Sequence, residues 1–190
     1  IMNTFATAVI VTYGDRYHFF GKVIQRLEKL TSIKNIVLVN NDMADNSFYN
    51  LKKIQSQKLI LVNHDKNKGS AQGFKKGIIA AENTKSDFIW LLDDDNLPHD
   101  NALKILIKKW EELKEKGLKK FALLSYRPDR KKYKQAIEYK KPDYMLGVRN
   151  SFLGFHVKQL FENKKTFKKR DVSIGKVLVA PYGGLFFHKS

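Results

Sequence analysis

Three consecutive carboxylates, Asp93, Asp94 and Asp95, come directly after the apolar run Phe88–Leu92. A short continuous apolar run predicts a buried strand, and this one ends in an anionic turn. Side chains alternate across a strand, so we expect Asp93 and Asp95 to point to one face of the sheet and Asp94 to the other. Two carboxylates on one face repel each other unless one is protonated or a cation lies between them.

A hard divalent cation would relieve this repulsion. Mg²⁺ and Mn²⁺ bind oxygen ligands and usually keep water and substrate phosphates as their remaining ligands. The alternative is a helix N-terminal cap, because Asp and Asn are favoured just before a helix. A cap accounts for one or two acidic residues rather than a run of them, so we interpret Asp93 and Asp95 as ligands of Mn²⁺ or Mg²⁺.

Short apolar strands alternate with amphipathic helices along the chain. The predicted strands are Phe5–Thr12, Asn35–Val39, Lys58–Val62, Phe88–Leu92, Phe121–Ser125, Val177–Ala180 and Leu185–Phe187. The predicted helices are Arg16–Leu30, a weaker one over Ala44–Gln57, one around Ala71–Ala81, one from Pro98 to Gly117 and a small one over Val157–Asn163. This alternation is typical of an α/β protein with a mostly parallel, Rossmann-like sheet sandwiched by helices.

Polar turns follow four of these strands. They are Thr12-Tyr13, Asn40-Asn41, Asn63–Asn67 and Asp93–Asn96. Ligands of such sheets bind beyond the carboxyl ends of the strands, so we expect these turns to form the site. Gly69, Gly73 and Gly77 recur at four-residue spacing and would allow the helix to approach a strand or ligand closely.

The composition limits the class of protein. The chain has 190 residues, 43% hydrophobic, and no cysteine, which fits one globular domain and excludes thiolate metal sites. It contains neither an apolar run long enough to span a membrane nor a signal peptide, so we expect a cytoplasmic protein.

The net charge of +17 predicts attraction to polyanions. The excess of basic residues concentrates in Lys114–Lys120, Arg127–Lys141 and Lys158–Arg170. Three interpretations stay open: a solvated surface, peripheral contact with an anionic membrane, and nucleic-acid binding. We expect no specific nucleic acid, because lysine dominates and arginine is the usual reader of bases.

Four blocks in order resemble glycosyltransferase family 2, whose members have the GT-A fold. The blocks are Val11-Thr12-Tyr13, Val39-Asn40-Asn41, Asn67–Gly73 and Leu92–Asp95. The likeness runs from Phe5 to Asn101 and weakly again from Pro181 to Ser190. Members that this chain resembles transfer rhamnose, galactofuranose or similar sugars during assembly of bacterial surface polysaccharides.

The resemblance implies a role for each block. Residues implied to contact the nucleotide-sugar are Thr12, Tyr13, Arg16, Asn40, Asn41, Asn67, Gly69, Asp93 and Asp94. Asp93 and Asp95 would bind the metal, and Gly183 and Gly184 resemble the bend under the acceptor. Asn40 stands where many members have an aspartate that reads the base, which leaves the identity of the base open.

The implied reaction is inverting, metal-dependent transfer from a UDP- or dTDP-sugar to a glycan or lipid-linked acceptor. The general base of the family lies in a motif beyond the strand that here ends near Ser190, so we expect an N-terminal fragment without a catalytic base. Residues 1–127 would be the nucleotide-sugar half of the domain and residues 128–190 the start of the acceptor half.

Rival interpretations are a sugar-phosphate nucleotidyltransferase, a phosphatase with an aspartyl nucleophile and a basic nucleic-acid-binding module.

Overall fold

The computed structural model describes residues 4–42, 54, 56–125, 131 and 181–189. The chain forms two compact units, one of Ile1–Ser125 with Tyr182–Ser190 and one of Tyr126–Pro181. Nearly all described residues belong to the first unit. The elements predicted at Val157–Asn163 and Val177–Ala180, and most of the weak helix predicted over Ala44–Gln57, lie outside the described residues.

Strands and helices alternate through the described part of the first unit, as predicted. The strands are β1 (Ala6–Thr12), β2 (Ile33–Asn40), β3 (Leu59–Asn63), β4 (Phe88–Asp93), β5 (Leu123–Leu124) and β6 (Leu185–His188). The helices are α1 (Tyr17–Glu28), α3 (Gly69–Glu82) and α4 (Ala102–Glu115).

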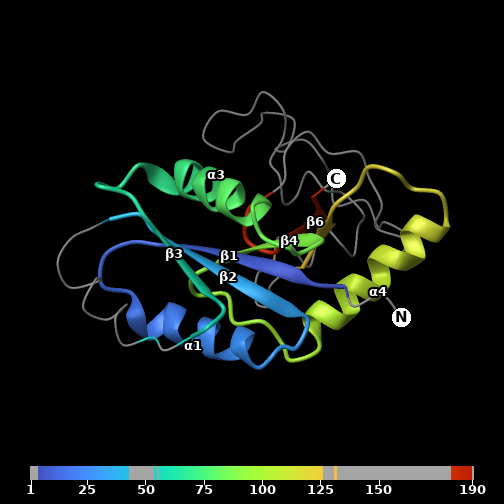
Figure 1. The fold of residues 1–190 in the computed structure, drawn as a ribbon, viewed down its shortest axis with the longest axis horizontal. Coiled ribbons are helices and arrows are strands. Elements are labelled where there is room, and N and C mark those ends of the chain that lie inside the picture. Colours follow the sequence, from blue (N-terminus) through green and yellow to red (C-terminus); the bar gives the residue numbers. More distant parts are fainter. Residues whose placement is uncertain (1–3, 43–53, 55, 126–130, 132–180, 190) are drawn as a thin grey trace, which may run out of the picture. The chain divides into compact units, whose positions relative to one another are not determined.

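The strands form one sheet in the order β3-β2-β1-β4-β6-β5. The pairs β1–β2, β1–β4 and β2–β3 are parallel, whereas β6 runs antiparallel to both β4 and β5. The predicted α/β class with a mostly parallel sheet is therefore confirmed. Parallel neighbours need crossover connections, and the described helices α1 and α3 lie on opposite sides of the sheet in Figure 1.

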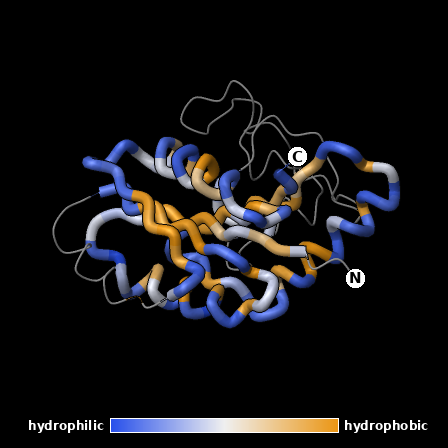
Figure 2. The backbone as a smooth tube through the Cα atoms, in the orientation of Figure 1, coloured by the Kyte–Doolittle hydropathy of each residue, from blue (hydrophilic) through white to orange (hydrophobic). Residues whose placement is uncertain are grey.

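Strand alternation divides the core into two layers. Residues such as Ile10 of β1 and Trp90 of β4 pack with α1 and α4, whereas Val9 of β1 and Leu91 of β4 pack with α3. Because both faces are covered, these strands are mostly apolar, and Figure 2 shows a largely hydrophobic sheet between more hydrophilic helix surfaces.

Helix α3 lies unusually close to the sheet. A Cβ atom on Gly77 would lie 2.4 Å from Cγ1 of Val9 and 3.0 Å from Cγ2 of Val39. A Cβ on Gly73 would lie 2.5 Å from Cγ1 of Val11. The close approach predicted from the glycine spacing is thus confirmed for these two positions, and it brings the first turn of α3 near the carboxyl ends of β1 and β2.

Helix α4 begins later than predicted, at Ala102 instead of near Pro98. The carbonyl of Pro98 accepts a hydrogen bond of 2.7 Å from Nη1 of Arg26, and Asp100 pairs with Nε of the same arginine at 3.0 Å. These contacts hold the segment against α1 in a non-helical path. The end predicted at Gly117 is confirmed, because this glycine follows the last turn with a φ of 85°.

Strand β5 is shorter than predicted. It covers Leu123–Leu124 instead of Phe121–Ser125, and the ring of Phe121 stacks on Trp110 of α4 with ring centroids 3.9 Å apart.

The close packing of α3 predicts a cost for any added side chain. Gly77→Ala should lower the free energy of unfolding by about 1–3 kcal/mol, because overpacking of a rigid core outweighs the helix propensity of alanine. Gly21→Ala is the matched control: it is also a buried helical glycine, but its Cβ would lie 3.5 Å from the Tyr17 ring, an ordinary contact. Urea unfolding of both variants checks the prediction, and equal stabilities of the two would contradict it.

Candidate functional site

The carboxyl ends of β3, β2, β1 and β4 lie side by side at one edge of the sheet. Thr12 pairs in register with Asn40, which pairs with Asn63, and Val11 pairs with Asp93. The polar turns that follow these strands therefore meet along one edge, as the sequence predicted. This edge is where ligands of parallel sheets bind.

Asp94 is buried and paired with Arg16. One carboxylate oxygen, Oδ2, accepts hydrogen bonds from Nε of Arg16 at 2.6 Å and from the hydroxyl of Thr12 at 2.9 Å. The other, Oδ1, accepts one from Nη2 of Arg16 at 2.7 Å. The two parallel N–H bonds form a bidentate pair, the strongest geometry for an arginine and a carboxylate. The side chain of Asp94 is 8% exposed, so water screens this pair little.

Arg16 also lies against two aromatic rings. Its guanidinium carbon is 5.4 Å from the ring centre of Tyr13 and 4.7 Å from that of Phe19, at distances typical of cation–π contacts. The hydrogen bond to Asp94 raises the pKa of Arg16 further above its usual range. Arg16 therefore stays cationic, and it neutralises one of the three adjacent carboxylates.

Asp93 and Asp94 point to opposite sides of the sheet, as alternation predicts. The side chain of Asp94 lies on the same face of the sheet as those of Trp90 and Leu92. There, on the side of α1, it contacts Thr12 and Arg16. Asp93 lies against the backbone of Gly183, where a Cβ would be 2.1 Å from its Oδ2 atom. Only a glycine leaves room for the carboxylate there.

The alternation argument does not reach Asp95. Strand β4 ends at Asp93, and the chain then turns, with the N–H of Asn96 donating to the carbonyl of Asp93 at 3.0 Å. Asp95 lies in this turn and is exposed. The turn, and not the strand, therefore sets the direction of the Asp95 side chain. Strand alternation does not place Asp95 on the same face as Asp93.

The donor set at this edge fits a magnesium-like ion. Within the part of the chain that the structure describes, no group of three or more His, Cys, Asp or Glu side chains is arranged to hold a metal. A site with one or two carboxylates suits an ion that takes its other ligands from water and a substrate phosphate. Asp93 and Asp95 offer hard oxygen atoms of this kind, while Asp94 is occupied by Arg16.

Asn41 organises the loop that enters α3. Its Nδ2 donates to Oδ1 of Asn67 at 3.0 Å and to the carbonyl of Gly69 at 3.1 Å, and its Oδ1 accepts from the N–H of Lys68 at 3.3 Å. Asn67 also accepts from the N–H of Gly69 at 2.9 Å. The sequence placed Asn41, Asn67 and Gly69 at the nucleotide, and the structure brings all three together in one hydrogen-bond network.

Three neighbouring side chains carry buried polar atoms without a hydrogen-bond partner. Among the described residues these atoms are Nδ2 of Asn40, Oδ1 of Asn63 and both ring nitrogens of His64. Asn40 and Asn63 are register partners at the ends of β2 and β3, and His64 follows directly. Sequence analysis identified Asn40 but assigned no role to the side chains of Asn63, the last residue of β3, and His64, which follows it.

The turn before β6 completes this edge. The N–H of Gly184 donates to the carbonyl of Leu91 at 2.7 Å, and a Cβ on Gly184 would lie 1.9 Å from the carbonyl oxygen of Ser125. Tyr182 stacks on Phe74 of α3 with ring centroids 4.8 Å apart. Gly183 and Gly184 thus lie beside the end of β4. The sequence did not predict the stacking of Tyr182 on Phe74, because the two residues are far apart in the chain.

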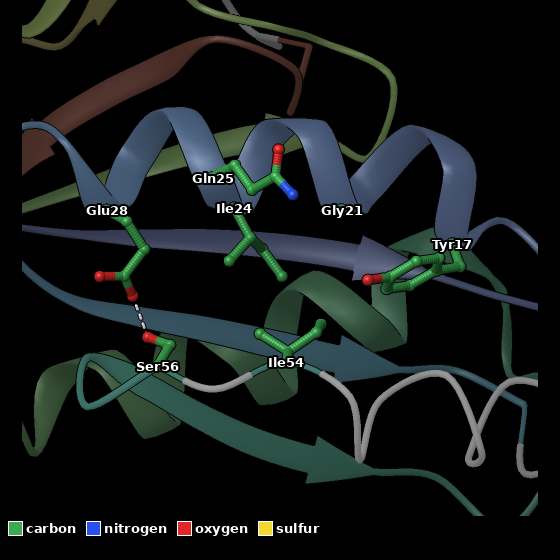
Figure 3. Close-up of a pocket in the computed structure, with 7 residues that line it drawn as sticks. All are labelled: Tyr17, Gly21, Ile24, Gln25, Glu28, Ile54 and Ser56. Carbon is green, nitrogen blue, oxygen red and sulfur yellow. Dashed lines mark hydrogen bonds between the residues drawn. The ribbon is translucent and has the colours of Figure 1, made fainter.

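A hollow along α1 is a poorer candidate for the site. It is lined by Tyr17, Gly21, Ile24, Gln25, Glu28, Ile54 and Ser56 (Figure 3). The carboxylate of Glu28 accepts a hydrogen bond from the hydroxyl of Ser56, and Glu28 is the one acidic side chain among the described residues that line the hollow. It therefore lacks the paired carboxylates that the β4 turn provides.

Of the predicted basic stretches, only Lys114–Lys120 lies among the described residues, at the end of α4, where its lysines are exposed. The other two fall mainly in Tyr126–Pro181, outside the described residues. No helix in the described ranges has the length and apolar character needed to cross a membrane.

A protein-family model, described as glycosyl transferase family 2, matches residues 7–181. No curated protein matches the chain.

The chain is similar to several solved structures. The mannosyltransferase PcManGT from Pyrobaculum calidifontis, solved with GDP-Man and Mn²⁺, is 15% identical with a TM-score of 0.47, and the match covers 54% of this chain and 31% of that protein. S. aureus TarS 1–349 with UDP-GlcNAc is 16% identical with a TM-score of 0.49, over 57% and 32%. The chain thus spans less than a third of the length of the first similar structures.

The network around Asn41 predicts that its amide cannot be replaced by a carboxylate. Asn41→Asp removes the donor to Asn67 and Gly69 and places an anion beside their oxygen atoms, so we expect a loss of about 2–4 kcal/mol in the free energy of unfolding. Asn83→Asp is the control, because Asn83 is an exposed asparagine with one bond, to the carbonyl of Ile79. Denaturant unfolding at neutral pH measures both, and equally small losses would contradict the role of Asn41.

Proposed function

The chain belongs to glycosyl transferase family 2, and on this premise we propose that it binds the nucleotide-sugar donor of a glycosyltransferase at the carboxyl edge of its sheet. The observation that carries the proposal is the acidic run at the end of β4, beside the end of β1. Asp93 is the last residue of the strand, Asp95 lies exposed in the turn that follows, and Asp94 between them is neutralised by Arg16. The family match favours this function over nucleotidyl transfer, phosphatase chemistry or nucleic-acid binding.

Asp95, with help from Asp93, would hold Mn²⁺ or Mg²⁺ at this edge. When bound, such an ion acts as a Lewis acid that stabilises the negative charge of a departing diphosphate. Other residues at this edge hold the acidic side chains in place. Thr12 and Arg16 fix the acidic turn, and Gly183 gives the carboxylate of Asp93 its space.

The nucleobase would lie at the ends of β2 and β3. A buried donor or acceptor without a partner costs about 1–3 kcal/mol, which a protein tolerates where a ligand later satisfies it. Nδ2 of Asn40 is an orphaned donor and Oδ1 of Asn63 an orphaned acceptor. The edge of a base offers both complementary groups, a carbonyl oxygen and an N–H. Since these atoms are covered, a base reaches them only when neighbouring side chains move aside.

The full reaction we propose is single-displacement transfer with inversion. A hydroxyl of a glycan or lipid-linked acceptor attacks the anomeric carbon, its proton passes to a carboxylate base, and the bond to the nucleoside diphosphate breaks. We assign the base to none of the described residues, and the acceptor to the side of Gly183 and Gly184. Assembly of surface polysaccharide and peripheral contact of the basic residues with an anionic membrane extend this proposal.

The proposed metal site predicts that Asp95→Asn abolishes the dependence of nucleotide affinity on the metal. We expect Mn²⁺ to strengthen UDP or dTDP binding at least about tenfold in the parent protein, which is about 1.4 kcal/mol, and to have no effect in the variant. Isothermal titration with and without Mn²⁺ measures this gain. Asp100→Asn, a change of an exposed carboxylate in the loop before α4, should keep it. An undiminished gain in Asp95→Asn would remove Asp95 from the site.

The proposed base site predicts that one substitution lowers binding with little change in stability. In Asn40 the Nδ2 atom has no hydrogen-bond partner, whereas Oδ1 accepts a long hydrogen bond of 3.4 Å from the N–H of Asp42. Asn40→Leu removes the unsatisfied donor together with this one bond, so the free energy of unfolding should change by less than about 1 kcal/mol. UDP affinity should fall about tenfold, because the base loses its partner. Asn41→Leu, which breaks the satisfied network, should instead lower stability. Unchanged UDP affinity in Asn40→Leu would place the base elsewhere.

A further inference from the structure

Arg16 connects two turns that are far apart in the sequence. It follows β1, yet its guanidinium lies on Asp94 in the turn after β4, 78 positions away. The hydroxyl of Thr12, the last residue of β1, reaches the same carboxylate. The turn after β1 and the acidic turn after β4 are therefore held together through one side chain.

Several features distinguish this pair from an ordinary surface ion pair, which contributes little. It is bidentate, with distances of 2.6 and 2.7 Å, and a third donor from Thr12 completes the carboxylate. The side chain of Arg16 is 27% exposed, and its guanidinium lies against the rings of Tyr13 and Phe19. Arg16 precedes α1 but makes no side-chain capping bond there, so the start of the helix does not account for its conformation.

The charges at the turn suggest what the pair is for. Asp93, Asp94 and Asp95 together carry three negative charges at neutral pH, and the sheet edge holds them close together. Arg16 neutralises the middle one of the three, Asp94. Asp95 also acts electrostatically on Arg16, so the guanidinium lies within reach of the field of the remaining carboxylates.

We propose that Arg16 is a positioning residue: through Asp94 it holds the Asp93–Asn96 turn in the conformation that presents Asp93 and Asp95 to a divalent cation and the donor diphosphate. This inference rests on the proposed function, and it assigns Arg16 a role other than the direct phosphate contact that the family resemblance implies. Arg16 then acts on the nucleotide only through the metal-binding turn, and Asp94 is its intermediary.

The test combines two variants with two measurements. Arg16→Gln removes the charge and the fork of N–H donors, and Asp94→Asn removes the carboxylate that they hold. In each variant we expect the gain in UDP affinity on adding Mn²⁺ to fall about tenfold, while affinity without metal changes less than about twofold. The double variant should be no worse than either single one, because both changes break one pair.

A second measurement does not need the nucleotide. Hydrogen exchange in peptides covering the Asp93–Asn96 turn should accelerate about tenfold in Arg16→Gln, whereas peptides covering Ile78–Ala81 of α3 should exchange as in the parent. Arg16→Lys, which keeps the charge but not the fork, should give intermediate exchange. Unchanged exchange in the turn would overturn the proposal.

The outcomes separate this inference from the proposed function. A large loss of metal-free UDP affinity in Arg16→Gln, but not in Asp94→Asn, would show direct phosphate contact and overturn the positioning role. If the parent protein binds UDP and dTDP with no gain from Mn²⁺, the proposed metal site fails, and the exchange measurement still decides whether Arg16 holds the turn.

Discussion

A bidentate ion pair between Arg16 and Asp94 is the contact on which the geometry of the candidate site depends. Parallel pairing of β1 and β4 brings their carboxyl ends together, and so places Arg16 beside the three consecutive carboxylates at the end of β4. Such an edge is unfavourable unless charge is compensated from within the protein or by a ligand. Arg16 compensates the charge of Asp94, and under the proposed function a divalent cation would bind at Asp93 and Asp95.

The packing of α3 supports the other half of the site. Its glycines at positions 73 and 77 remove the side chains that would hold the helix away from the valines of β1 and β2. The first turn of the helix then lies where Asn41 can bond Asn67 and the carbonyl of Gly69. A core constraint, the contact of backbone with valine side chains, thus determines how the loop between β3 and α3 is held.

Asn40 and Asn41 show how neighbouring identical residues take different tasks. Both the Nδ2 and the Oδ1 atoms of Asn41 make hydrogen bonds, and these bonds contribute to stability. Asn40 is fully buried, yet its Nδ2 has no partner, and the same holds for polar atoms of Asn63 and His64 beside it. Buried polar atoms without partners cost stability, and such costs are concentrated at functional sites. The polar end of β2 and β3 therefore combines a rigid loop with unsatisfied groups.

Hydrophobic periodicity predicted the parallel strands, the helices between them and the edge at which the polar turns meet, because buried strands and amphipathic helices follow directly from the apolar pattern. It did not predict the start of α4 or the short extent of β5. The carboxylates after β4 and the resemblance of four short blocks to a family were also readable from the residues, and the family match agrees. Tertiary structure decided which carboxylate Arg16 neutralises, which asparagine is satisfied and that Gly183 makes room for Asp93. These pairings join residues many positions apart in the chain, and local pattern carries no information about which distant side chains strand pairing will bring into contact.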